Sequence, residues 1–102
     1  MVGPSIDIPA ISKEFLKTGV GGSPDLPSFP VWVALLPVGQ DPGPSDWVKA
    51  EWIVESGVNK AAVLVGAGTD LPLTKGLLHQ VWVLIIAAPE EPVLKPGTVY
   101  AS

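Results

Sequence analysis

Three features of the sequence predict an all-β protein. The chain has 102 residues, which is enough for one compact domain and too few for two. Twelve prolines and eleven glycines interrupt it every few residues, and this density excludes long helices. Between these breaks lie short apolar runs, with turn residues recurring roughly every 8 to 12 positions. About seven short strands are therefore expected.

The N-terminal fifth of the chain predicts an arm followed by a strand. Residues 1–10 carry two prolines around "SIDI" and are expected to form an extended arm, with room for a short edge strand. In residues 11–20, a helix pairing Ile11 with Phe15 at i, i+4 stays open. A strand is favoured because glycines follow closely and no helix N-cap pattern precedes the segment.

The remaining strands follow in order. Residues 31–36, "VWVALL", predict a strand that is apolar on both faces. Residues 47–54 alternate in polarity and predict a half-exposed strand. Its expected inward side chains are those of Val48, Ala50, Trp52 and Val54. Further strands are expected at 60–65, 79–87 and 98–101.

The number and spacing of these strands favour an Ig-like β-sandwich of about seven short antiparallel strands, formed by residues 11–102. A small β-barrel is the alternative architecture. The extended N-terminal arm, residues 1–10, is the only segment set apart from this domain.

Charge and composition exclude several classes of function. The chain has six basic residues, all lysines, against ten carboxylates, so no cationic patch for nucleic acid can be built. It has no cysteine, which excludes disulfides and thiolate metal sites. The apolar run 81–88 is far shorter than the ~20 residues of a transmembrane helix. We expect neither nucleic acid nor membrane as a partner.

No constellation of catalytic residues is found. His79 is the single histidine and is expected to be structural or at the rim of the domain. The pairs Glu51–Glu55 and Glu90–Glu91 are best explained as solvated charges, although glycosidases use paired carboxylates. No G-x-S-x-G motif is present. We therefore expect no enzyme activity, no catalytic residue, no cofactor and no metal.

The apolar content exceeds what one small domain needs for its core. Both the 31–36 strand and the 79–87 strand lack a polar face, and such surfaces on soluble proteins usually mark protein interfaces. Coverage by the chain's own loops, "DLPSF" and "LPLTKGLL", is the alternative. The candidate interface residues come from the arm, from the strand expected in residues 11–20 and from these two strands: Ile6, Ile8, Ile11, Phe15, Trp32, Trp82, Leu84 and Ile86.

Four stretches, in this order and spacing, resemble a group of small Ig-like virion proteins from tailed phages of actinobacteria. They are "LLPVGQDPGPSDW" (35–47), "VLVGAG" (63–68), "GLLHQVWV" (76–83) and "PEEPVLKPGTV" (89–99). Together they span about two-thirds of the chain. The chain departs from the group in "LIIAA", where polar residues are usual after "VWV".

The resemblance implies a non-enzymatic structural part of the virion, assembled in the host cytoplasm. The expected role is a capsid decoration or minor capsid protein that binds the major capsid protein and its own copies. A neck or tail component is the alternative within this class. A carbohydrate-binding Ig-like module is the alternative from another class, and it requires at least two coplanar, solvent-exposed tryptophans.

Overall fold

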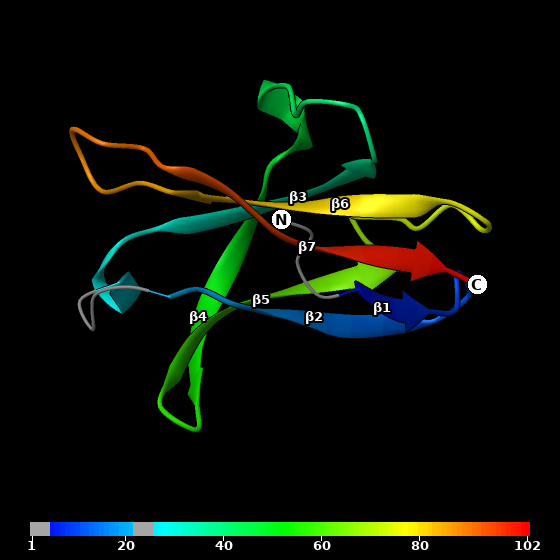
Figure 1. Ribbon diagram of the computed structural model, residues 1–102, viewed down its shortest axis with the longest axis horizontal. Coiled ribbons are helices and arrows are strands. Elements are labelled where there is room, and N and C mark those ends of the chain that lie inside the picture. Colours follow the sequence, from blue (N-terminus) through cyan, green and yellow to red (C-terminus); the bar gives the residue numbers. More distant parts are fainter. Residues whose placement is uncertain (1–4, 22–25) are drawn as a thin grey trace.

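The computed structural model describes residues 5–21 and 26–102, and this part of the chain contains seven strands (Figure 1). They are β1 (Ser5–Ile8), β2 (Lys13–Gly19), β3 (Val31–Pro37), β4 (Val48–Glu55), β5 (Val58–Gly66), β6 (Leu78–Ile85) and β7 (Val93–Ala101). Two single-turn 3-10 helices, η1 (Leu26–Ser28) and η2 (Pro44–Asp46), lie in the connections. The prediction of an all-β protein is confirmed, and residues 13–19 form a strand and not a helix.

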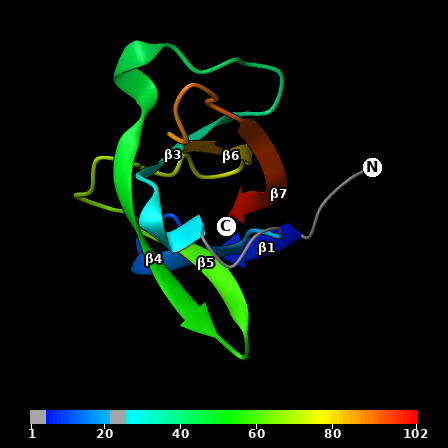
Figure 2. The same ribbon diagram turned by 90° about the vertical axis from the view of Figure 1, so that its left-hand side faces the viewer.

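The strands form one mixed sheet in the order β1-β7-β6-β3-β4-β5-β2, which curls into a half-barrel (Figures 1 and 2). The long strand β4 makes the bend, because residues 48–50 pair with β3 and residues 51–55 pair with β5. The two edges of the sheet are β1 and β2, which are consecutive in the chain. The curl brings the inner faces of both halves around a common core.

The described part of the predicted N-terminal arm is a strand of the chain's own sheet. β1 runs parallel to β7, with Ser5 opposite Thr98 and Ile8 opposite Ala101. The described strands of residues 13–101 pair antiparallel, as expected for the domain, and the sheet is mixed only through β1 of the arm. An extended segment can pair with the open edge of β7 in either direction. Residues 1–4 of the arm lie outside the described residues.

The core is built from alternate residues of the central strands. In β3 and β6 the buried side chains include Val31, Val33, Val81 and Val83, each at most 3% exposed. β5 adds Val65 from the opposite side of the half-barrel, and all five belong to one hydrophobic cluster. The period of two in these strands therefore decides which apolar row is internal.

The β4–β5 hairpin turns tightly at Ser56 and Gly57, whose φ angles are 52° and 76°. Two residues with positive φ match the twist of the flanking strands. The hairpin extends past the rest of the sheet (Figure 1), so Val54 near its tip is 61% exposed. The expectation that Val54 points into the core is wrong, because no second layer lies opposite the tip.

The apolar loops pack against the core and do not cover the outer face of β3 and β6. Leu71 is 4% exposed within the core cluster, while Leu26, Phe29 and Leu73 pack against it. The segment that arches over the outer side of β3 and β6 is the connection 38–47, which carries η2 (Figures 1 and 2). The second apolar row of these strands lies on the outer side of the sheet beneath this connection, where Ala34 is 0% exposed and Trp32, Trp82 and Leu84 are partly exposed.

Candidate assembly interface

Four of the eight predicted interface residues come together on the outer face of β3 and β6. In the register of this pair, Trp32 lies opposite Leu84 and Ala34 lies opposite Trp82. The Ile86 N–H donates to Pro30 O over 3.0 Å, which continues the ladder by one residue. Trp32, Trp82, Leu84 and Ile86 are all partly exposed. We call these four residues the outer apolar row.

Each tryptophan of the outer apolar row lies beneath a lysine. Lys49 Nζ is 5.5 Å from the centroid of the Trp32 ring, and Lys95 Nζ is 4.9 Å from that of Trp82. A cation within about 6 Å of an indole face is attracted by the ring quadrupole. The outer face therefore combines two half-buried aromatic rings with two positive charges, in a protein of net charge −4.

Further exposed apolar residues extend this face and were not predicted. Val93, 47% exposed, lies opposite Leu84, and the exposed pair Leu78 and Tyr100 lies further along β6 and β7. Leu78 has the same parity as Trp82 in "LHQVWVLI", so strict alternation was a usable signal for it. Val93 could be placed only with the β6–β7 register.

Two predicted residues lie outside the outer apolar row and are strongly exposed. Phe15, on β2 opposite Leu64, is 66% exposed on the outer side of the sheet. Ile11 lies in the connection between β1 and β2 and is 89% exposed. Among the large apolar side chains of the described residues, these two have the highest exposed fractions.

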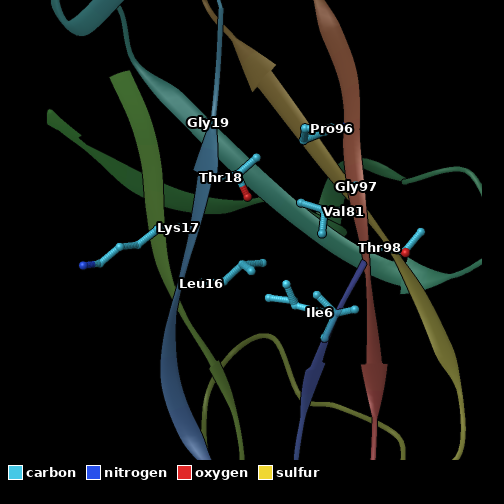
Figure 3. A pocket seen from close by; sticks show the side chains of 10 residues that line it. Ile6, Leu16, Lys17, Thr18, Gly19, Val81, Pro96, Gly97 and Thr98 are labelled. Atoms are coloured by element: carbon cyan, nitrogen blue, oxygen red, sulfur yellow. The ribbon is translucent and has the colours of Figure 1, made fainter. Parts of the chain in front are cut away.

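The two isoleucines of β1 point inward, toward the core. Ile8 is 3% exposed and belongs to the chain's own core cluster, so it is not a surface residue in this arrangement. Ile6 is 44% exposed and lines an open groove between β2 and β7, together with Leu16 and Val81 (Figure 3). The sequence predicted both residues at an interface surface. Of the two, only Ile6 is partly exposed, and Ile8 is buried.

The four tryptophans do not form an open aromatic platform. All four lie among the described residues, and each is only partly exposed. The Trp52 Nε1–H donates to Phe29 O over 2.7 Å, which holds that ring against the core. A stacked sugar would have to displace Lys49 from Trp32 or Lys95 from Trp82. The geometry does not favour carbohydrate binding.

The indole nitrogens of Trp52 and Trp82 differ in their hydrogen bonding, because the buried Trp82 Nε1 has no partner among the described residues. Losing a satisfied hydrogen bond strands its acceptor, whereas removing an unsatisfied buried donor relieves a cost. We expect Trp52→Phe to reduce the free energy of unfolding by about 1–2 kcal/mol more than Trp82→Phe does. Urea denaturation measures both, and equal losses would contradict the assignment.

His79 is structural, being 2% exposed between two backbone groups. The Thr74 N–H donates to its Nε2 over 3.2 Å, so Nδ1 carries the proton and faces Val99 O at 3.3 Å. Within the described ranges, no three His, Asp or Glu side chains gather closely enough to hold a metal ion. Nor does any helix in residues 5–21 and 26–102 have the length and apolarity to cross a membrane.

Glu55 ties three strands together at the far end of the sheet. Its carboxylate accepts from Lys17 Nζ over 3.0 Å and from Lys60 Nζ over 3.1 Å. The hydrogen bond from Lys17, followed by that from Lys60, lowers the pKa of Glu55 below its ordinary value. All three side chains are in contact with water, so solvent screens the cluster and its effect is small.

The lowered pKa of Glu55 fixes the pH range in which this cluster stabilises the fold. The contribution of the cluster to folding stability is complete above the unfolded-state pKa of Glu55, about 4.3. It is lost as the pH falls through the lower folded-state pKa. We expect Glu55→Gln to be less stable than the wild type at pH 7 and equally stable in strong acid. Unfolding measured from pH 7 to 2 tests this, with Glu90→Gln in the exposed stretch 88–92 as control. A difference that persists or grows in acid would contradict it.

The chain matches no family model, no curated protein and no solved structure. The case for its function therefore depends on its own surface.

Proposed function

We propose that this protein is a non-enzymatic structural component of a tailed-phage virion. Its proposed role is that of a capsid decoration or minor capsid protein that binds the major capsid protein and its own copies. The observation that carries the proposal is the outer apolar row: Trp32, Trp82 and Leu84 lie side by side on the outside of the sheet. Contiguous apolar surface of this kind on a small domain usually marks a protein interface.

The chemistry of this face suits protein contact. Half-buried tryptophans are frequent energetic centres of interfaces, where surrounding residues exclude water. Lys49 and Lys95 already cover the two rings, so their aliphatic stems extend the apolar area and their ammonium groups can meet carboxylates of a partner. The proposed partner surface is therefore apolar at its centre and acidic at its rim.

The Ig-like sandwich is part of the same proposal. It is supported by the division of β4, whose first residues pair with β3 and whose last residues pair with β5. It is also supported by a core cluster that joins Leu16 and Val63 from one half of the sheet to Val83 and Val99 from the other. Two groups of strands facing each other across one core are the basis of a sandwich.

Fractionation of virions tests the proposal. The particles of the phage that encodes the chain are purified on a density gradient, and capsids and tails are then separated. We expect the wild-type protein to migrate with capsids lacking tails. The Trp32→Asp, Trp82→Asp double variant is expected to be absent from these capsids. Migration with the tails would assign it to the neck or tail instead, and absence from all particles would overturn the virion role.

A further inference from the structure

We propose that β1 is exchanged between copies of this protein, so that Ser5–Ile8 of one copy pairs with β7 of a neighbour. This inference depends on the proposed function only for the multi-copy assembly that brings the copies together. The acceptor site is complementary to the segment, because the chain's own β1 occupies it with a continuous ladder to Thr98–Ala101. A second copy carries the same segment and meets the same contacts, which makes exchange a low-cost route to association.

The acceptor edge fits this short segment better than a longer foreign strand. The parallel ladder covers four residues of β7, from Thr98 to Ala101. Two positions before it stands Pro96, which has no N–H to donate to an added strand. After the ladder, the Ser102 N–H donates to Ile8 O over 3.1 Å, which fixes the end of β7 to the end of β1. The edge therefore accepts about the length of strand that β1 supplies.

β1 is held to its own sheet by few side-chain contacts. Of its four residues, Ile8 alone is buried, while Ser5, Ile6 and Asp7 are exposed. An edge strand with one buried side chain belongs to the least stable part of a fold and opens before the rest. Release of β1 therefore leaves the central strands of the half-barrel paired.

The connection between β1 and β2 is suited to act as a hinge. It spans residues 9–12 and is closed by a bond from Ser12 N–H to Pro9 O of 2.9 Å. Proline at position 9 fixes its own φ near −65°, a value that extended chains also adopt. Straightening residues 9–11 breaks the Ser12–Pro9 bond and the 2.9 Å bond from Ala10 N–H to Ser102 O, and it carries Ser5–Ile8 toward a neighbour while Ser12 stays bonded to the Ala67 N–H.

The exposed apolar residues of this region find contacts in the exchanged arrangement. Ile11, in the hinge, is 89% exposed, and Phe15, on the next strand, is 66% exposed. In an exchanged pair the two hinges pass each other, so Ile11 of each copy meets the hinge and β2 of the other. In the self-paired chain both side chains remain in water, which is the less favourable state for apolar surface.

Cysteine cross-linking tests the exchange, because the natural chain has no cysteine. Ser5 and Thr98 lie opposite each other in the register, so Ser5→Cys and Thr98→Cys are made as separate variants. The two are unfolded together, refolded at high concentration and oxidised. We expect a covalent dimer whose disulfide joins position 5 of one variant to position 98 of the other. Thr98→Cys mixed with Ser45→Cys, a substitution in exposed η2, controls for random collision.

The outcomes separate this inference from the proposed function. If the mixture gives no dimer joined through positions 5 and 98, while a chain with both substitutions cross-links internally at every concentration, the exchange is overturned. Deleting Ala10 and Ile11 shortens the connection and should prevent β1 from pairing with its own β7. Light scattering should then show a dimer. A monomer whose β1 amides are unprotected against hydrogen exchange would also overturn the exchange. Exchanged dimers that do not bind particles would overturn only the virion role, and particle binding without exchange would overturn only this inference.

Discussion

Replacing Gly66 by alanine is expected to lower the free energy of unfolding by about 3 kcal/mol or more. Gly66 ends β5 with φ of +107°, and an added Cβ would overlap the carbonyl oxygen of Ser12. That carbonyl cannot move freely, because it accepts from the Ala67 N–H over 2.9 Å. The Gly66 N–H is also fixed by a 2.9 Å bond to Leu71 O. Backbone strain and steric overlap therefore act together.

Gly68→Ala is the matched control for this substitution. Gly68 lies in the same turn with φ of +76°, but no described atom lies within 4 Å of an added Cβ. Only the left-handed backbone penalty applies there, and it costs about 1–2 kcal/mol. Urea denaturation of both variants measures the difference. Equal losses would show that the approach of residues 12 and 66 is looser than the structure has it.

Ile85→Ala is expected to lower the free energy of unfolding by about 2–4 kcal/mol. Ile85 is 2% exposed on the inner face of β6, opposite Val31. Its truncation leaves a cavity in the core cluster, next to the β3–β6 ladder, whose paired strands resist collapse into it. Chemical denaturation measures the loss, and a cost below about 1 kcal/mol would contradict the assignment of the inner face.

Leu84→Ala, at the neighbouring position, is the control. It is expected to affect binding more than folding stability. Leu84 is partly exposed on the outer face opposite Trp32, so its truncation costs little folding stability. Because it belongs to the outer apolar row, the same truncation should weaken the proposed binding to the capsid. A variant that binds particles like the wild type but folds poorly would assign Leu84 to the core instead.

Local pattern predicted most of the strands. Strand β6 (Leu78–Ile85) falls within two residues of the expected 79–87, because alternating burial and flanking turns are local properties. Strand β7 begins at Val93, well before the expected 98, since an irregularity between Val81 and Val83 of β6 lets the ladder continue past Pro96. Proline was a poor boundary signal at this position because an irregular register tolerates it.

Long-range pairing was beyond the reach of the sequence. The parallel direction of β1 depends on β7, at the opposite end of the chain, and no local signal encodes it. The outer apolar row could be predicted, because two-sided apolar strands leave one row outside. Ile8 was placed on an interface and lies in the core, since the short run "SIDI" shows no periodicity long enough to orient it. The lysines over Trp32 and Trp82 required the strand register.

Lysine acylation tests the central claim, that the outer apolar row is an assembly interface, on the natural protein. Lys49 and Lys95 stand over the row, whereas Lys75 is an exposed residue of the 67–77 connection. The free protein and the particle-bound protein are acylated briefly, and each lysine is quantified by mass spectrometry. We predict that binding protects Lys49 and Lys95 while Lys75 reacts as before. Equal reactivity of Lys49 and Lys95 in the two states would contradict the claim.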